Sequence, residues 1–434
     1  MPELARRLAR IPDWAWLTAI VVVSTLVRAW LARGMPAPFV FVDELIYWEL
    51  ARSLADTGSY AVRGVPTSGY SLLYPALLAP VTWLTDVLPS AYGLAKALNA
   101  LVMSLAAVPA WLLARRVGGR WLALLAAVLA VALPSLAYTA TIVTENLFYP
   151  VALVVAWALV RVLEMPSWRR VALLAVALGA ALATRSQALG FLAAVVLAPF
   201  VLALVARDRR LLRPFAPLLG AVAALAGLVV VGQLARGRSL SDLLGAYSVV
   251  GEGGYDVGDV LRFWLWHVEE LTLYVAVIPV IVLVVLVAIG PQLPARLREH
   301  VAATLALVAT STLVVGAFAS RFASDRVQDR YLFFLAPLVL VAVLGWVAIG
   351  APRPRVPLVV GTLVAVGLVV AFPYTRFIGE PAKSDSFGLI PLWTANAHLL
   401  GGSYRVTVLV AALALAALAA FVPARRAVAV PLVL

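Results

Sequence analysis

Long apolar runs follow one another along the chain, and short arginine-rich stretches separate them. A helix needs about 20 mostly apolar residues to cross a membrane, and most of the runs reach or approach that length. The runs on either side of Thr184 and Arg185 are shorter, so the pattern predicts a tight helical hairpin there. The runs lie at about 13–33, 90–114, 121–140, 146–163, 171–184, 186–206, 214–234, 271–290, 300–319, 331–349, 357–372 and 405–422. The pattern predicts an all-α polytopic membrane protein with about 12 transmembrane helices (range 11–13).

Charged residues predict which helix ends share a side of the membrane. An even number of spans puts both termini on one side, and the loops on that side are rich in arginine, which marks it as cytoplasmic. These arginines are Arg6, Arg7, Arg10, Arg115, Arg116, Arg120, Arg169, Arg170, Arg207, Arg209, Arg210, Arg213, Arg296, Arg298, Arg353, Arg355, Arg425 and Arg426. Of the 21 Asp and Glu residues, those on or near that side are Glu3, Asp13, Glu164, Asp208 and Glu299. We therefore expect the chemistry on the outer face of the cytoplasmic membrane, where the other acids and the longer loops lie.

Three outer segments are long, at about 34–89, 235–270 and 373–404. The first contains an acidic helix that is predicted to lie along the membrane surface and to end at Gly58. No polar region exceeds about forty residues, so we expect 1–434 to form a single integral-membrane domain without a soluble domain.

Two adjacent carboxylates, Asp43 and Glu44, follow the first span directly. Ionised carboxylates are costly near a bilayer, so a pair held there is a functional-site hypothesis, and we expect both to be catalytic. On a helical wheel Asp43 shares an arc with Tyr47 and Leu50, which predicts that it points toward the protein body. The alternative, compatible with the first interpretation, is that Asp43 caps the N-terminus of the helix.

Two further charges stand at the edges of apolar runs. Glu145 lies at the outer end of a span and is expected to approach the same surface as Asp43. Arg185 interrupts an apolar stretch, where a guanidinium needs a partner and an anionic one is natural. The alternatives are an exposed loop acid or helix cap for Glu145, and an arginine that snorkels from a helix end for Arg185.

Arg330 and Tyr331 open a span after a short outer loop, and arginines there run against the positive-inside trend. They are expected to hold a phosphate at headgroup depth. The alternative is that Arg330 pairs with Asp325 or Asp329. Arg28, late in the first span, is expected to neutralise one of the first-loop carboxylates.

Composition narrows the chemistry. The chain is 64% hydrophobic and 13% charged, whereas soluble proteins are about half apolar and a quarter charged. It has no cysteine, which excludes thiol catalysis, thiolate metal sites and disulfides, and its three histidines leave little scope for a histidine-rich metal site. The net charge of +13 does not indicate nucleic acid, because the arginines lie mainly in short loops, where they set topology.

Several short motifs follow one another along the chain. They are Arg28, Asp43-Glu44 with Tyr47, Thr57-Gly58-Ser59-Tyr60, Tyr74-Pro75, Leu112 to Gly119, Thr144-Glu145, Thr184-Arg185 and Arg330-Tyr331-Leu332. This order resembles the GT-C superfamily of polyprenyl-phosphate-sugar-dependent glycosyltransferases, which includes protein O-mannosyltransferases, aminoarabinose transferases and actinobacterial envelope enzymes. Many relatives carry a soluble outer domain after the last spans. The chain stops at Leu434 without one, so we expect its outer loops to recognise the acceptor.

The resemblance implies transfer of a hexose or pentose from a polyprenyl-phosphate donor to a hydroxyl of a glycolipid, glycan or protein, with inversion. The Lys-poor, Ala- and Arg-rich composition is typical of a GC-rich genome. For an actinobacterial envelope enzyme of this kind, the resemblance implies mannose or arabinose as the donor sugar. The implied donor-phosphate ligands are Arg185, Arg330 and Tyr331. The implied substrate pocket is Arg28, Tyr47, Tyr74, Glu145 and His267.

Two questions stay open at this level. Some relatives use a divalent cation such as Mg or Mn between first-loop and second-loop acids, and others use none. The alternative function is a transporter or flippase of a lipid-linked or amphipathic substrate, since charges within a membrane also mark transport sites. Such sites tend to lie near the midplane between repeated halves, and no repeat is apparent here.

Overall fold

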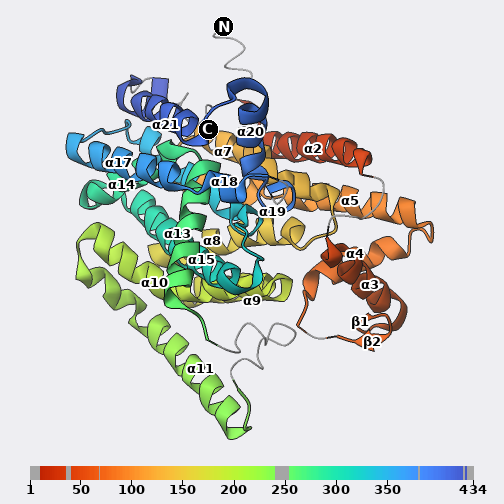
Figure 1. The fold of residues 1–434 in the computed structure, drawn as a ribbon. Coiled ribbons are helices and arrows are strands. Elements are labelled where there is room, and N and C mark those ends of the chain that lie inside the picture. Colours follow the sequence, from red (N-terminus) through yellow and green to blue (C-terminus); the bar gives the residue numbers. More distant parts are fainter. Residues whose placement is uncertain are drawn as a thin grey trace.

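The structure is a computed structural model, and it describes residues 10–35, 41–67, 69–239, 254–379, 382–423 and 426–427. Most of the helices pack side by side in one bundle, with α3 (Val42–Thr57), α4 (Leu73–Thr82) and a short hairpin at one end (Figure 1). The helices of the bundle are α2 (Asp13–Leu31), α5 (Leu88–Ser104), α6 (Ala107–Val117), α7 (Arg120–Ala132), α8 (Glu145–Glu164), α9 (Trp168–Thr184), α10 (Leu189–Ala206), α13 (Val257–Tyr274), α14 (Val277–Ala288), α15 (Ala295–Phe322), α16 (Ala336–Ala348), α17 (Arg355–Ala371) and α21 (Tyr404–Phe421). Helix α11 (Ala216–Ala235) extends away from this bundle (Figure 1).

Short helical turns join these helices. They are η1 (Ala32–Gly34), η2 (Pro134–Ala140), η3 (Ser186–Ala188), η4 (Arg209–Phe215), η6 (Gly290–Gln292), η7 (Asp329–Tyr331), η8 (Phe333–Leu335), α18 (Tyr374–Phe377), α19 (Ala382–Asp385), η9 (Phe387–Leu389), α20 (Ile390–Ala395) and η10 (Asn396–Leu400). Among the described residues, 7 helices are long and apolar enough to cross a membrane, or up to 9 if each of two bent pairs is one span. The predicted all-α polytopic membrane fold is confirmed, with bent or shorter helices in place of several straight spans. A break between two helices is present at Thr184 and Arg185, because α9 ends at Thr184 and η3 leads into α10.

The second of these bent pairs, formed by α13 and α14, changes the interpretation of one predicted outer loop. α13 and α14 meet at 107°. α13 begins at Val257, within the segment 235–270 that was expected to be an outer loop, so its aromatic residues up to His267 lie on a helix. The charged residues of α13, among them Glu269 and Glu270, interrupt the apolar run that would mark a span.

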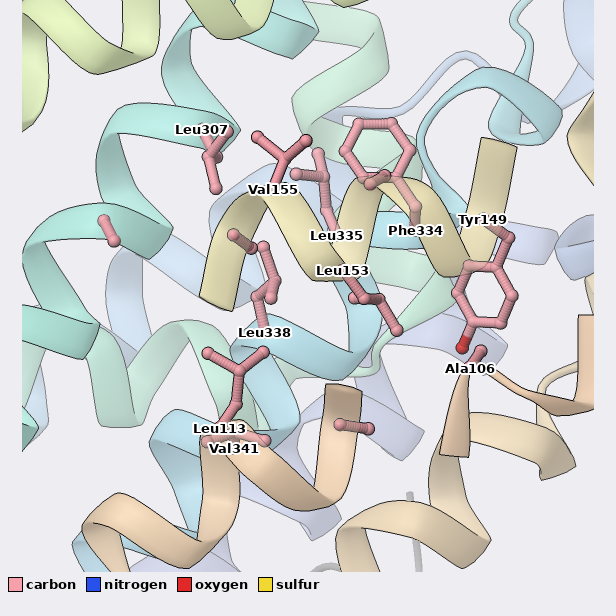
Figure 2. Close-up of a cluster of buried hydrophobic side chains, with 14 of the residues drawn as sticks. Ala106, Leu113, Tyr149, Leu153, Val155, Leu307, Phe334, Leu335, Leu338 and Val341 are labelled. Atoms are coloured by element: carbon pink, nitrogen blue, oxygen red, sulfur yellow. The ribbon is translucent and has the colours of Figure 1, made fainter. Parts of the chain in front are cut away.

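The main core lies where α6, α8, α15 and α16 meet. Figure 2 shows Leu153 and Val155 of α8 among Leu113, Leu307 and other apolar side chains from the neighbouring helices. The hydroxyl of Tyr149 donates to the carbonyl of Ala130 at 2.7 Å, so the polar atom of this buried ring is satisfied. These contacts fix the start of α8, and therefore Glu145, relative to the other helices.

A glycine allows α13 to cross α15 closely. A Cβ at Gly316 would lie 2.7 Å from the backbone of Trp264, closer than packed atoms tolerate. The indole nitrogen of Trp264 donates to Thr312 Oγ1 at 3.0 Å, one turn earlier on α15. The small residue therefore sets the distance between the helix that carries Glu270 and the helix that precedes the Arg330 loop.

The first outer segment is a compact unit packed on the bundle. Gly58 has φ +70° and ends α3 as predicted, because glycine adopts this left-handed conformation without a steric penalty. Strands β1 (Ala61–Val62) and β2 (Val65–Pro66) then form a hairpin, and α4 packs against α3. Tyr47 and Tyr74 join the two helices through an edge-to-face contact at 5.6 Å.

Candidate functional site

The guanidinium of Arg330 is the centre of a charged cluster at the α3 end of the bundle. Its side chain is 6% exposed and lies on η7, between α15 and α16. Nε lies 3.1 Å from Oε1 of Glu145, Nη2 lies 3.4 Å from Oδ2 of Asp43, and Nη1 lies 3.6 Å from Oδ1 of Asp385. One arginine therefore joins three carboxylates from three separate segments of the chain.

A second arginine shares the most buried of these carboxylates. Nη1 of Arg185 lies 2.8 Å from Oε1 of Glu145 and donates to Oγ1 of Thr144 at 3.3 Å. Arg185 sits in the break between α9 and α10, so its side chain leaves the helix ends and reaches the start of α8. Arg185 is therefore not a snorkelling side chain. Glu145 is neither an exposed loop acid nor the helix cap, because Thr144 occupies the N-cap of α8.

Aromatic rings cover both guanidinium groups. The Arg185 guanidinium lies over the Tyr331 ring at 4.2 Å, and that of Arg330 lies over Phe41 at 4.6 Å. Nη2 of Arg330 also donates to the Tyr331 hydroxyl at 3.2 Å. These contacts fix the guanidinium planes while leaving in-plane donors available to an anion.

Asp43 and Glu44 have different surroundings although they are adjacent. The side chain of Asp43 is 44% exposed, so one face of its carboxylate is open while the other contacts Arg330. Glu44 is buried, and its Oε2 accepts from the Tyr92 hydroxyl at 2.7 Å and from the Ile142 amide at 3.0 Å. Phe41 occupies the N-cap of α3, so Asp43 is not the helix cap. The open carboxylate is therefore Asp43, and Glu44 anchors α3 to the bundle.

The segment from Asp385 to Gly388 packs on the cluster, and sequence reasoning did not include it. Oδ2 of Asp385 also lies 3.0 Å from Nη1 of Arg326. The Gly388 amide donates to Oδ2 of Asp329 at 2.7 Å, and the Phe387 ring stacks on Tyr138 at 4.4 Å. An outer acid in a weakly patterned loop carries no sequence signal that would assign it to Arg330.

Burial and charge set the protonation states of the cluster. Burial lowers the pKa of Arg330, but Glu145 and its other neighbours outweigh burial and raise it well above its usual value, so the guanidinium stays charged. Arg185 behaves in the same way, because burial lowers its pKa and Glu145 more than restores it. Burial raises the pKa of Asp329 to about 7, which the Gly388 amide opposes and nearby Asp385 reinforces.

Comparisons with known proteins bear on the family and the fold. A family model for dolichyl-phosphate-mannose-protein mannosyltransferases matches residues 73–232. The fold is similar to the crystal structure of ArnT from Cupriavidus metallidurans in the apo state, with a TM-score of 0.51, 18% sequence identity, and coverage of 95% of this chain and 74% of that chain. No curated protein matches the chain in sequence. The predicted resemblance is confirmed. The family match lies in the first half of the chain, and the likeness in fold to ArnT extends over nearly all of it.

The structure brings together four of the residues that the GT-C resemblance implied besides Asp43: Glu145, Arg185, Arg330 and Tyr331. The alternative pairing of Arg330 with Asp325 or Asp329 does not occur. Asp325 instead pairs with Arg376, and Asp329 accepts from Gly388.

Four other implied pocket residues have structural contacts instead. Nη2 of Arg28 donates to the carbonyl of Val131 at 2.9 Å, so the structure gives it no first-loop carboxylate as a partner. Tyr74 is buried and donates to Oδ1 of Asn99 at 3.1 Å, and Tyr47 packs against it. His267 is buried, with Nδ1 2.7 Å from the carbonyl of Phe263 and Nε2 accepting from the amide of Gln328 at 3.3 Å. His267 thus supports the loop that carries Arg330 from behind.

A divalent cation between first-loop and second-loop acids does not fit these side chains as they lie. Asp43 and Glu145 are the acids in question, and the Arg330 guanidinium contacts both. The part of the chain that the structure describes contains no group of three or more His, Cys, Asp or Glu side chains that could hold a metal ion. The charge between the two acids is therefore supplied by arginine.

Proposed function

We propose that this protein is a GT-C glycosyltransferase, which transfers a sugar from a polyprenyl-phosphate donor to an acceptor hydroxyl at the Asp43–Arg330 cluster. The observation that carries the proposal is the contact between a half-open carboxylate and a buried guanidinium, with 3.4 Å between Oδ2 of Asp43 and Nη2 of Arg330. A base for the acceptor and a cation for the leaving phosphate thus lie side by side.

Asp43 is the general base in this proposal. Its carboxylate takes the proton of the acceptor hydroxyl while the acceptor oxygen forms a bond to the anomeric carbon. The bond between that carbon and the phosphate oxygen breaks, and its electron pair leaves with the polyprenyl phosphate. Such a direct displacement inverts the anomeric centre, because the acceptor attacks opposite the leaving group.

Arg330, Arg326 and Arg185 bind the donor phosphate in this proposal. Asp385 now contacts Arg330 and Arg326, and a phosphate offers the same guanidinium groups more oxygen acceptors. Glu145 is a poorer candidate for displacement, because it is buried and two arginines hold it. The donor phosphate therefore takes the place of the Asp385 carboxylate, and Glu145 keeps both arginines oriented.

The proposed site faces the outside of the cytoplasmic membrane. Support comes from the charge pattern, since the arginine-rich loops lie at the other ends of α8 and α15. The neighbouring membrane accommodates the lipid tail of the donor. It also limits the access of water, which would hydrolyse the donor.

Purified protein in nanodiscs provides the test. The protein is incubated with labelled polyprenyl-phosphate hexoses and pentoses and with candidate hydroxyl acceptors, and release of polyprenyl phosphate is measured. We expect acceptor-dependent release that Asp43→Asn removes. Movement of intact donor between leaflets without release, in sealed vesicles, would instead establish a flippase.

A further inference from the structure

A cavity of about 380 Å³ lies where α6 and α8 end and where α9 and α15 begin. Its charged lining is Arg116, Arg161, Arg170, Arg296, Glu164 and Glu299. α8 joins this cavity to the Asp43–Arg330 cluster, because the helix begins at Glu145 and ends at Glu164. A helix of 20 residues is about 30 Å long, the thickness of the hydrocarbon core. The cavity therefore belongs to the opposite membrane surface, at the depth of lipid headgroups.

Three guanidinium groups converge on one carboxylate in this cavity. Arg116 pairs with Glu164, and Nη1 of Arg161 and Nη1 of Arg170 each lie 3.7 Å from its Oε2. Each guanidinium carries about five N–H donors, whereas one carboxylate offers roughly four lone-pair sites. N–H donors therefore remain in excess, although Nη1 of Arg170 also donates to the carbonyl of Arg161 at 2.8 Å.

Two further residues leave the cavity net positive. Arg296 is exposed, and it makes no ion pair within the described ranges of the chain. Glu299 is half-buried, and its Oε2 has no hydrogen-bond partner among the described residues. The four arginines exceed the two glutamates, so the lining carries an excess of positive charge beside the membrane.

We propose that this cavity binds the phosphate of an anionic phospholipid from the adjoining leaflet. Guanidinium groups recognise phosphate oxygens in bidentate fashion, and basic pockets between helix ends attract acidic headgroups. The volume lies at the lower end of the roughly 300–1,000 Å³ of ligand pockets, which suits a headgroup whose chains stay in the bilayer. Arginines that only set topology need no shared cavity, and these converge on one.

Thermal unfolding in nanodiscs tests the proposal without reference to glycosyl transfer. The full chain is placed in phosphatidylcholine with increasing phosphatidylglycerol, and tryptophan fluorescence reports Tm. We expect Tm to rise with the anionic fraction, because a ligand that binds only the folded state stabilises it. The phosphatidylglycerol fraction at half of the rise should be about tenfold higher for an Arg170→Gln/Arg296→Gln double variant.

Arg169→Gln is the matched control, since Arg169 adjoins Arg170 but is exposed and contacts the Trp168 ring instead of lining the cavity. It should respond as wild type. Arg296→Gln alone is the variant to use if the double variant does not fold, and it should also shift the response. A response of either cavity variant equal to wild type would overturn the proposal.

Two further arms identify the ligand. Glu164→Gln removes the carboxylate that competes for the arginines, so the half-point should fall to a lower phosphatidylglycerol fraction. Inorganic phosphate added to phosphatidylcholine nanodiscs should give little stabilisation. A rise in Tm equal to that with phosphatidylglycerol would make the cavity a free-phosphate site and overturn the lipid assignment.

Discussion

Asp43 and Arg330 are 287 positions apart, yet Nη2 of Arg330 lies 3.4 Å from Oδ2 of Asp43. The contact joins the first outer segment to the short turn between α15 and α16. It also connects the proposed base to the proposed phosphate site, so the two roles can be separated only by variants that act on one side of the pair.

Asp43→Asn should remove the base and keep the fold. The amide still accepts from Arg330 but cannot take the acceptor proton, so turnover should fall by about 10²–10⁴-fold while donor binding changes little. Release of polyprenyl phosphate and donor affinity are measured together. Asp56→Asn, on an exposed position of the same helix, is the matched control. Near-normal turnover of the Asp43 variant would assign the base to another residue.

Glu44→Gln should act on stability instead of chemistry. Glu44 is buried, its Oε2 accepts from Tyr92 and Ile142, and its Oε1 accepts from the Phe41 amide. Glutamine replaces one of these oxygens with an NH2 group, so the donors on that side lose their acceptor. We expect a loss of about 1–3 kcal/mol in unfolding free energy, seen as a lower Tm, with turnover per folded molecule largely kept. If turnover collapses while Tm stays unchanged, Glu44 has a catalytic role that its burial does not suggest.

Asp385→Asn should tighten donor binding. The variant loses the charge that competes with a phosphate for Arg330 and Arg326, so the affinity for polyprenyl phosphate should rise several-fold. Arg330→Gln should have the opposite effect, with affinity about tenfold weaker, since each charge-assisted bond contributes about 1.5–3 kcal/mol. Asp325→Asn is the control. Asp325 lies on the same loop as Arg330, but it pairs with Arg376 and does not contact Arg330. Weaker binding by Asp385→Asn would show that this segment supports the phosphate site instead of competing with it.

The sequence was sufficient for the fold class and for part of the cluster. Apolar runs mark the helices because the membrane demands them, and charges at the edges of those runs identified Glu145, Arg185 and Arg330. The sequence did not predict that Asp385 belongs to the cluster, because its loop has no periodic pattern. The separate roles of Asp43 and Glu44 also depend on distant partners: Tyr92 and Ile142 bury Glu44, and no local rule predicts that adjacent acids diverge so far.

Stability should depend on pH through Asp329. Its pKa is raised to about 7 in the fold, by burial first and then by the nearby charge of Asp385, whereas the carboxyl of an unfolded aspartate has its ordinary pKa of 3.8. Between these values the folded state binds more protons, so the stabilisation is fully present below pH 3.8 and is lost as the pH rises to about 7. Glu270 and Arg330 also face this group and shape the same transition.

Tm measured from pH 5 to pH 8 checks this expectation. The wild type should lose stability on approach to pH 7 and then level off, and Asp329→Asn should remove that part of the slope. The amide keeps an oxygen for the Gly388 N–H, so the loop contact survives. Asp325→Asn, which changes an exposed acid nearby, should keep the wild-type slope. A slope unchanged by Asp329→Asn would show that other groups cause it.

The membrane orientation gives the last prediction, and the chain is well suited to the test because it has no cysteine. Asp56 lies on the exposed face of α3, and Arg169 lies at the exposed start of α9, just after α8 has crossed the bundle from Glu145 to Glu164. Acids concentrate at the end of the bundle that carries Asp56, and arginines concentrate at the end that carries Arg169. Asp56→Cys should therefore react with an impermeant maleimide in intact cells. Arg169→Cys should react only after the membrane is opened. If Arg169→Cys reacts in intact cells and Asp56→Cys does not, the topology is the reverse of the one proposed. The proposed transfer would then take place on the cytoplasmic side.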